Sequence, residues 1–394
     1  MRIAIISDWH LGVDFDTELG KDSFTNLFSA FKQLEKQDID LLLVPGDLFD
    51  VTVPSHEVLF EAISIFKDFN IKNNFSEIKA KLPILAIIGN HEYRSKDYVT
   101  TVEILESLGF LKLLKADCLK FEKEKIAIFG MTGIPEKYAK DYLLEKFNPK
   151  PVTGYYNILM VHQSIVEYLP FEDEMVATIS LSDLPSGFDL IVNGHLHWSS
   201  VVNLPQGPKF LLPGSTVTTQ IKQKETEKAK GYFILDTNTK ALDFFEITGV
   251  RKIHYLDIKF TKKTTPIEIL LKAKEELEKL EKNQGKKAIV RIRLKGELED
   301  GELLKNLDIN SLKKEYSNYF YISLKNDISE KKLKESIEQL KKLQTENKNV
   351  QELAKDIFSE QIEQTKISKD FDYKRLYELL ENGDIEKAKG VLKD

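Results

Sequence analysis

Short apolar runs that each end in a polar, metal-ligating motif constrain this chain more than any other feature of its sequence. Five of the seven histidines belong to such motifs, and each motif follows a run typical of a buried strand. In chain order the motifs are Asp8-Trp9-His10, Gly46-Asp47, Gly89-Asn90-His91-Glu92, His162 and Gly194-His195-Leu196-His197. Buried carboxylates and imidazoles are costly unless they are paired or bind a cation. The pattern therefore predicts a metal site built at the ends of several strands.

Residue type and spacing indicate what each motif contributes to such a site. In an extended segment, residues two apart point to the same side, so Asp8 and His10 can both face one point. The same spacing relates His195 to His197. A carboxylate has two oxygens, so that of Asp47 could bridge two cations. The mixture of nitrogen and oxygen donors suits manganese, iron or zinc better than magnesium or calcium. A lone histidine after a strand is usually structural, and the prediction depends on the motifs occurring together.

Strand and helix patterns alternate through residues 1–250. Strands such as Leu41–Pro45 and Ile84–Ile88 are separated by helical patterns such as Ser55–Phe69. This alternation predicts an α/β class of fold, a layered mixed-sheet domain. The later strands, between residues 125 and 236, lack intervening helices, which predicts antiparallel pairing among them.

The pattern changes near residue 250. The pattern predicts a small β-α-β-α-β capping domain over residues 251–326. It then predicts a helical linker over 327–370 and a pair of short helices over 371–394. The whole chain has a net charge of −6, yet the capping segment carries 18 Lys and Arg against 12 Asp and Glu. This local surplus makes the capping domain a candidate DNA-binding surface.

Several features exclude a membrane or secreted protein. No apolar run approaches the roughly 18 residues that a membrane span needs, and the N-terminus shows no secretory signal pattern. The single cysteine, Cys118, cannot form an internal disulfide, which fits a reducing compartment. We therefore expect a cytoplasmic protein with no membrane contact.

The order of the motifs resembles that of the calcineurin-like metallophosphoesterases. The resemblance implies two divalent metal ions, one held by Asp8, His10, Asp47 and His197 and the other by Asp47, Asn90, His162 and His195. It also implies that His91 faces the scissile phosphate as the catalytic residue. Two cations neutralise an anionic phosphodiester and lower the pKa of a bridging water. A general acid such as His91 could then protonate the leaving 3′ oxygen.

A narrower resemblance, to the SbcD family of DNA double-strand-break repair nucleases, covers nearly the whole chain. It depends on the segments Ser7–Gly12, Gly46–Asp50, Leu181–Pro185 and Pro213–Ser215. The family is the bacterial and archaeal counterpart of the eukaryotic double-strand-break nuclease. It implies a manganese-dependent 3′–5′ exonuclease, an endonuclease, or both, acting at the nucleoid on double-stranded DNA ends and hairpins. Its partner would be an SMC-like ABC ATPase of the SbcC type. Archaeal relatives often have histidine where this chain has Asp50, so a substrate contact there is in doubt.

DNA affinity is expected to come from basic side chains that contact phosphates. The candidates follow the third motif or lie in the capping domain: Arg94, Lys96, Lys286, Lys287, Arg291 and Arg293. For any single one of them, a solvated surface charge is the simpler interpretation. Trp198 could stack on an unpaired base or pack in the interior, whereas Trp9 is expected to point into the core.

The C-terminal helix pair is expected to bind the ATPase. Helices of about ten residues are unstable alone in water, so their apolar stripes must be buried against a partner. The expected contacts are Tyr373, Leu376, Leu379, Leu380, Ile385 and Leu392. A homodimer is also expected, from the resemblance and from surplus apolar residues in helical stretches 55–69 and 99–108. Burial of those faces against the sheet is the alternative.

Two other functions would account for the motifs. A phosphatase or nucleotide phosphodiesterase of the same superfamily could use the same ligands, but it would leave the capping domain and the helix pair without a role. A DNA-end-binding scaffold with a vestigial site is the second alternative, and the complete ligand set argues against it.

Overall fold

The computed structural model describes residues 1–69, 83–94, 98–169, 179–205, 207–221, 223–282 and 286–329, together with Arg375 and Leu379. These residues form two compact units. Unit 1 comprises Met1–Tyr255, Lys282–Arg291 and Asn318–Ser323, and unit 2 comprises Leu256–Glu281, Ile292–Ser317 and the described residues from Leu324 onward. The predicted domain boundaries at 250 and 326 stay predictions. Most of the predicted linker and helix pair lies outside the described residues.

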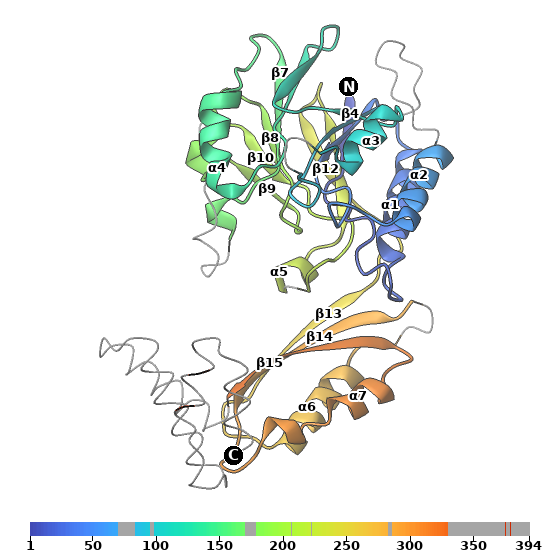
Figure 1. Cartoon of the computed structure of the whole chain (residues 1–394), viewed down its shortest axis with the longest axis vertical. Coiled ribbons are helices and arrows are strands. Elements are labelled where there is room, and N and C mark those ends of the chain that lie inside the picture. Colours follow the sequence, from blue (N-terminus) through green and yellow to red (C-terminus); the bar gives the residue numbers. More distant parts are fainter. Residues whose placement is uncertain are drawn as a thin grey trace, which may run out of the picture. The chain divides into compact units, whose positions relative to one another are not determined.

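The first sheet of unit 1 has the strand order β12-β11-β1-β2-β3-β4, and Figure 1 labels its two edge strands, β12 and β4. Its strands are β1 (Arg2–Ile5), β2 (Leu41–Pro45), β3 (Ile84–Ile87), β4 (Lys112–Leu113), β11 (Gly231–Asp236) and β12 (Ala241–Glu246). Strands β1 to β4 are parallel, and β11 and β12 join one side antiparallel.

The second sheet of unit 1 has the order β5-β6-β7-β8-β10-β9. Its strands are β5 (Asp117–Phe121), β6 (Ile126–Gly130), β7 (Tyr156–Val161), β8 (Leu190–Asn193), β9 (Ser200–Asn203) and β10 (Lys209–Leu212). The mixed character expected of the sheet is confirmed. Between residues 125 and 236, antiparallel pairing is correct for β9 and for β11 of the first sheet. It is wrong for β6, β7, β8 and β10, which pair in parallel with one another. Long connections, such as residues 131–155, permit these crossovers without a long regular helix.

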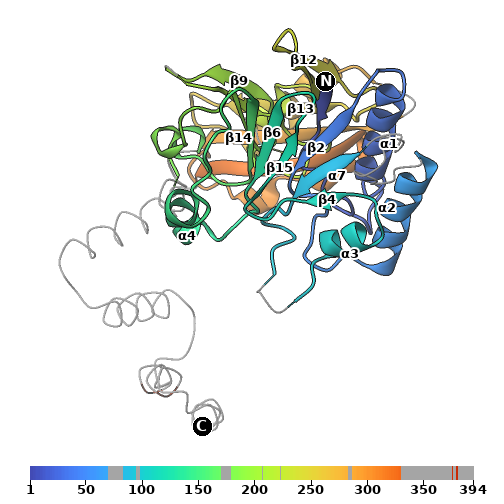
Figure 2. The same cartoon turned by 90° about the horizontal axis from the view of Figure 1, so that it is seen from above.

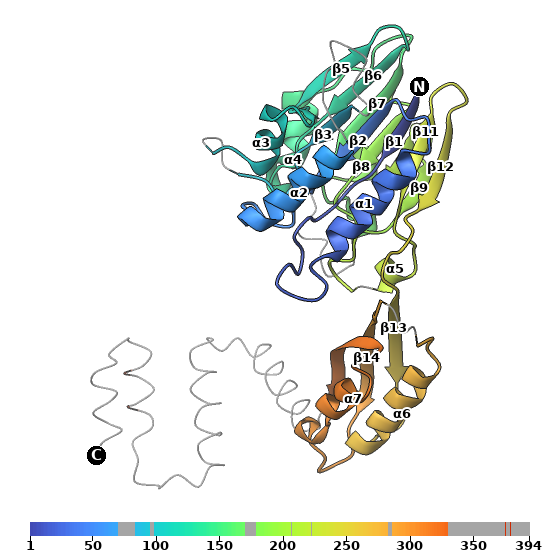
Figure 3. The same ribbon diagram turned by 90° about the vertical axis from the view of Figure 1, so that its right-hand side faces the viewer.

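Apolar side chains on both faces of the strands explain the layered arrangement. In β1, Ile3 and Ile5 belong to a core cluster shared with second-sheet residues such as Ile158 and Met160. Ala4 and Ile6 belong to the cluster under the helices of the first sheet. Those helices are α1 (Asp22–Leu34), α2 (His56–Asp68) and α3 (Thr101–Ser107). Figures 2 and 3 show them along the outer side of this sheet.

Local signals in the sequence start these helices. The Ser55 hydroxyl accepts the Val58 N–H at the start of α2, and Thr100 and Glu103 form a capping box at α3. On the second sheet, α4 (Glu136–Asp141) continues into a π-helical turn, η1 (Tyr142–Phe147). Trp9 is fully buried against Phe31 and Phe66, which confirms its expected place in the core.

Four further short helical elements occur in the part of the chain that the structure describes. They are η2 (Val166–Tyr168), η4 (Leu181–Asp183), α5 (Gln223–Thr226) and η5 (Leu304–Asn306).

A three-stranded sheet with the order β13-β14-β15 follows. Its strands are β13 (Ile253–Lys259), β14 (Ala288–Glu297) and β15 (Phe320–Ser329), and the helices α6 (Pro266–Glu278) and α7 (Ile309–Glu315) connect them in the chain. The expected alternation of strands and helices is therefore present. In α6, Ile269, Ala273 and Leu277 are buried, whereas Ile267 and Leu271 are 70% and 63% exposed.

Candidate metal centre

The predicted ligands follow the carboxyl ends of parallel strands in both sheets of unit 1. Motifs one to three follow β1, β2 and β3 of the first sheet, and the other two follow β7 and β8 of the second. The backbone there is not extended as expected. Asp8, His10, Asp47 and His195 have φ angles of 52°, 44°, 50° and 75°. Left-handed non-glycine residues are strained and cluster at functional sites. The side chains therefore converge through tight turns, and the extended geometry predicted for them is wrong.

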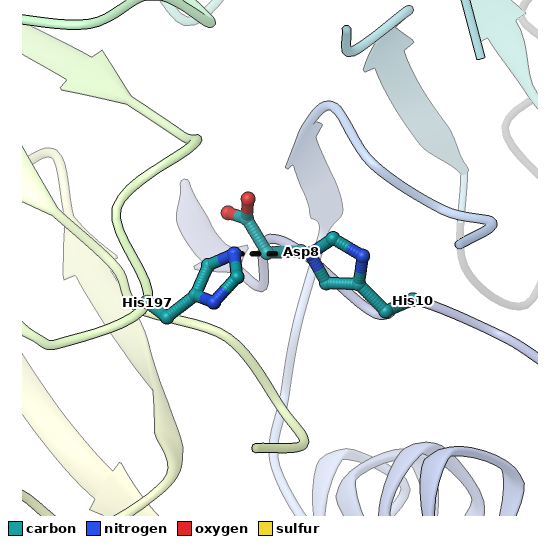
Figure 4. Close-up of side chains that lie close together, drawn as sticks. All are labelled: Asp8, His10 and His197. Carbon is teal, nitrogen blue, oxygen red and sulfur yellow. Dashed lines mark hydrogen bonds between the residues drawn. The ribbon is translucent and has the colours of Figure 1, made fainter. Parts of the chain in front are cut away.

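One group of ligand atoms comes from Asp8, His10 and His197 (Figure 4). The Nε2 atoms of His10 and His197 lie 3.1 Å apart. His10 Nδ1 lies 3.1 Å from the Asp50 carboxylate, which can only accept, so this nitrogen carries the proton. Two imidazole nitrogens approach this closely only when a proton or a cation lies between their lone pairs.

A second group comes from Asp47, His162 and His195. His162 Nε2 lies 3.2 Å from Asp47 Oδ2, and both His162 Nε2 and His195 Nδ1 lie 2.9 Å from Asn90 Oδ1. Asp47 Oδ2 is also 3.8 Å from His10 Nε2, and a third group joins Asp47 with His10 and His91. The Asp47 carboxylate therefore lies between the two groups, as a bridging ligand would.

The donor set fits divalent cations. Asp8 Oδ2 is buried and has no hydrogen-bond partner among the described residues, although Asp8 Oδ1 accepts the N–H of His195. A buried carboxylate oxygen without a donor is costly, and a cation would satisfy it. Imidazole nitrogens with carboxylate and amide oxygens form a ligand set that first-row divalent metals favour.

The outer nitrogen of each ligand histidine has a partner that orients the ring. His162 Nδ1 lies 2.8 Å from the Pro45 carbonyl oxygen, and His195 Nε2 lies 3.0 Å from Ser164 Oγ. His197 Nδ1 lies 2.7 Å from Thr219 Oγ1. Such outer contacts turn the other nitrogen toward the metal. The roles of Ser164 and Thr219 were not predicted, because no spacing in the sequence connects them to the ligands.

The pKa values show that the second group favours a positive charge on His162 and disfavours one on His195. Burial opposes protonation of His162, but the adjacent Asp47 carboxylate outweighs it and raises the pKa of His162 to about 10. Burial likewise disfavours the charged form of Asp47, yet the charge of His162 holds its pKa well below the usual range. Burial and His162 together lower the pKa of His195 to about 3. A proton on His162 therefore competes with a cation for the same lone pairs.

His91 lies at the exposed side of this cluster, with 36% of its side chain accessible. Its backbone N–H donates to Asp47 Oδ1 at 3.0 Å, and its Nδ1 lies 2.5 Å from the Asp50 carbonyl oxygen. The hydrogen bond to a carbonyl places the proton on Nδ1, so Nε2 is the nitrogen left for a substrate. Asp50 thus contacts both His10 and His91. The histidine that archaeal relatives often have at this position did not suggest this intramolecular role.

Glu92 joins two of the ligand loops. Its carboxylate accepts the N–H of Phe49 at 2.7 Å and that of Gly89 at 2.8 Å. Glu92 is fully buried, and burial together with the charge of Asp47 raises its pKa to about 8. Its position in the third motif was the available signal for this structural role.

The predicted DNA-binding residues lie outside this cluster, and those that are described make intramolecular contacts. Arg94 donates to the Val99 carbonyl and lies over the Tyr98 ring. The contacts within the basic stretch are Lys286 to Asp22 at 2.9 Å, Lys287 to Glu18 at 3.5 Å, Arg291 to Ser323 Oγ at 3.1 Å and Arg293 to Asp327 at 2.5 Å. Lys96 lies outside the described residues.

The remaining predicted contacts concern the ATPase and Trp198. Leu379 is helical and partly exposed, whereas Tyr373, Leu376, Leu380, Ile385 and Leu392 lie outside the described residues. Trp198 packs against the core cluster of the second sheet, which favours the interior alternative.

Residues 1–199 match the family of calcineurin-like phosphoesterases, and the chain belongs to this family. Within this family, the chain is similar to several double-strand break repair proteins. It is 30% identical over 284 residues to the double-strand break repair protein MRE11 of Encephalitozoon cuniculi, covering 64% of this chain and 48% of that protein. It is 27% identical over 304 residues to the DNA double-strand break repair protein Mre11 of Sulfolobus acidocaldarius, covering 75% of each. The protein of the same name in Saccharolobus solfataricus is 26% identical over 319 residues, 77% of each chain.

The chain therefore spans about half the length of the first relative and about three quarters of the other two. Among the described residues, no helix is long and apolar enough to cross a membrane.

Proposed function

We propose that this chain is a metal-dependent DNA nuclease that processes double-strand breaks. The observation that carries the proposal is the Asp47 carboxylate, which lies between two groups of candidate metal ligands beside His91. Phosphodiesters are the substrates that such a paired centre suits, because two cations offset the charge that repels a nucleophile. The three relatives are double-strand break repair proteins by name, which supports DNA as the substrate.

The proposed ligand assignment follows the two groups. One cation would be held by Asp8, His10, Asp47 and His197, and the other by Asp47, Asn90, His162 and His195. When bound, the cations would lower the pKa of a water and stabilise charge on the phosphate. We infer Mn²⁺ as the working ion, because the donor mixture suits manganese, iron or zinc and the family resemblance favours manganese among them.

His91 would be the catalytic side chain. Its Nδ1–H is held by the Asp50 carbonyl oxygen, which leaves Nε2 toward the exposed side of the site. Protonated at Nε2, the imidazole can donate a proton to the leaving 3′ oxygen; hydrogen bonding there also offsets developing charge. In this proposal Asp50 positions His91 without contacting the substrate.

The DNA backbone would contact basic residues outside the metal cluster. Arg94 lies beside the third motif and stacks on the exposed ring of Tyr98, a pair suited to a phosphate and a base face. The basic residues of the stretch 286–293 would exchange their present protein partners for DNA phosphates. They are Lys286, Lys287, Arg291 and Arg293. Lys96 is proposed from its place in the sequence alone.

The test compares substrates for the purified chain. With Mn²⁺ we expect hydrolysis of linear and hairpin double-stranded DNA and a much slower reaction with a chromogenic phosphomonoester. Chelation should remove the activity, and renewed Mn²⁺ should restore it. Faster turnover of the phosphomonoester would instead identify a phosphatase. Stable binding of DNA ends without metal-dependent cleavage would identify a scaffold.

We also propose a homodimer through the surface that includes α2, α3 and the loops beside them. Large apolar side chains are exposed there, with Phe60 70%, Val53 66% and Leu108 53% accessible. Exposed apolar surface of this kind often marks a protein interface. Light scattering at micromolar concentration should give twice the chain mass for the wild type and a monomer for Phe60→Glu.

An ABC ATPase of the SbcC type is the proposed partner, bound through the segment 371–392. This proposal comes from the sequence and the family resemblance. Replacing Leu379 and Leu380 with Glu should abolish co-purification with the ATPase and leave the Mn²⁺-dependent activity of the isolated chain intact. Loss of the fold in this variant would contradict it.

A further inference from the structure

A buried lysine, Lys230, lies behind the candidate ligand His197 in unit 1. Its Nζ donates to the His197 carbonyl oxygen at 3.0 Å, to Ser215 Oγ at 2.8 Å and to Glu225 Oε1 at 2.7 Å. Lys230 and Glu225 are both buried. All three ammonium hydrogens therefore have acceptors. Burying such an ion pair is costly and adds little net stability, so its position beside a metal ligand calls for another explanation.

Glu225 also holds His197 from its imidazole side. The Thr219 hydroxyl lies 2.7 Å from His197 Nδ1, and the Thr219 backbone N–H donates to the Glu225 carboxylate. Glu225 Oε1 itself lies 3.9 Å from His197 Nδ1. One carboxylate thus organises both the partner of the His197 main chain and the partner of its ring.

The segments that meet at His197 come from different parts of the chain. Lys230 precedes β11, Glu225 belongs to α5, and Ser215 follows β10. The Ser215 N–H adds a second hydrogen bond to the His197 carbonyl, at 3.3 Å. At the neighbouring Gly214, with φ of 77°, a Cβ would lie 2.9 Å from the Ser199 nitrogen. This close approach holds the turn against the loop that carries His197.

We propose that Lys230 and Glu225 form a positioning pair for His197. The pair sets the affinity of the cation that Asp8, His10 and His197 hold. The second cation is independent of it, because the outer nitrogens of His162 and His195 contact the Pro45 carbonyl and Ser164 instead. This inference rests on the proposed metal centre. Substitution of outer partners of a metal ligand typically lowers affinity by about 10–100-fold.

The primary test is Mn²⁺ binding to the metal-stripped full-length chain, measured by titration calorimetry and by metal content after dialysis. The wild type should bind two ions. Lys230→Met should bind one of them about 10–100-fold more weakly and the other unchanged. Equal weakening of both ions, or no weakening, would overturn the proposal. A wild type that binds fewer than two ions would overturn the metal centre itself, before any substitution is considered.

A second variant separates positioning from stability. Exchanging a buried ion pair for apolar residues is often neutral or stabilising, so Lys230→Met with Glu225→Leu should recover the melting temperature. The weakened ion should stay weak in this double variant. If the single variant does not fold, the Mn²⁺ binding measurement is made on this double variant instead. Recovery of full metal affinity would show that the pair serves the fold alone, and would overturn the inference.

Two controls make the assignment specific. Arg251→Met removes a partly buried ion pair of unit 1, Arg251 with Asp22, and should leave both Mn²⁺ affinities unchanged. In a His197→Ala background, Lys230→Met should cause no further loss of metal affinity, because residues that act through one another are not additive. Full additivity would show that Lys230 acts elsewhere.

Discussion

The metal centre and the basic stretch 286–293 contrast in how completely their polar groups are satisfied. The metal centre has left-handed backbone at four ligand candidates, an orphaned Asp8 oxygen and two imidazole nitrogens 3.1 Å apart. In the basic stretch, Lys286, Lys287 and Arg293 each have a carboxylate partner. The first region has polar atoms that a cation would satisfy, whereas the charged side chains of the second already have protein partners.

The metal centre and the basic stretch would therefore bind phosphates in two different ways. Strain and unsatisfied atoms preorganise the metal centre, so removal of one ligand should have a large effect there. Exposed ion pairs contribute only about 0–1 kcal/mol, so basic side chains can exchange a carboxylate for a phosphate at little cost. Single substitutions in the basic stretch should therefore have small effects.

Asp47→Ala should reduce nuclease activity to the uncatalysed background, because this carboxylate lies between both ligand groups. The bound Mn²⁺ should fall below two ions per chain when measured after dialysis. Asp243→Ala on β12, where Asp243 is exposed, is the matched control and should keep both activity and metal. Retained activity in Asp47→Ala would remove the contrast between the regions.

His91→Leu should lower kcat by about 10²–10⁴-fold, the usual contribution of a general acid. Both Mn²⁺ ions should remain bound, because His91 is not among the proposed ligands and its ring Nδ1 is held by the Asp50 carbonyl oxygen. Steady-state kinetics and metal content measure the two effects separately. Loss of an ion in this variant would make His91 a ligand and contradict its assigned role.

The metal-free protein should lose stability between about pH 6.5 and pH 10. The pKa of His162 is raised to about 10 in the folded state, so its stabilising charge is fully present below about pH 6.5 and is lost as pH rises through 10. Ionisation of Glu92, with a pKa raised to about 8, acts in the same direction.

Melting temperatures measured across this range, with and without Mn²⁺, test the stability prediction. Saturating Mn²⁺ should flatten the decline, because the cation binds the deprotonated imidazole. His162→Asn should flatten the part above pH 8 in the metal-free protein. An unchanged pH profile in that variant would assign the decline to other groups.

Arg293→Ala should have the smallest effect. We expect DNA affinity to fall only a few-fold, and the slope of log K against log salt to decrease by about 1, as for one lost phosphate contact. Lys274→Ala removes a comparable ion pair of unit 2, with Glu315, and serves as the control. If the fold-change in DNA affinity of Arg293→Ala were as large as the fold-change in kcat of His91→Leu, the basic stretch would be preorganised after all.

Much of the fold and the site could be predicted from sequence because it depends on local pattern. Runs such as Leu41–Pro45 must be buried strands, and the small residue and carboxylate that follow in Gly46-Asp47 indicate a tight, polar turn. The candidate ligands were identified on this basis, and the structure brings them into one cluster. The helical stretches predicted at 55–69 and 99–108 correspond to α2 and α3, and the structure shows Ser55 and Thr100 capping their starts.

Other features depend on contacts between distant segments, and only the tertiary structure decided them. Strand direction in the second sheet follows from crossover paths, which apolar periodicity does not encode. Left-handed backbone at Asp8 and His10, the shared role of Asp50, and the pairing of Lys230 with Glu225 behind His197 arise from side chains that meet only after folding. Residue type and order determined which chemistry this chain can perform, while packing decided which atoms face one another.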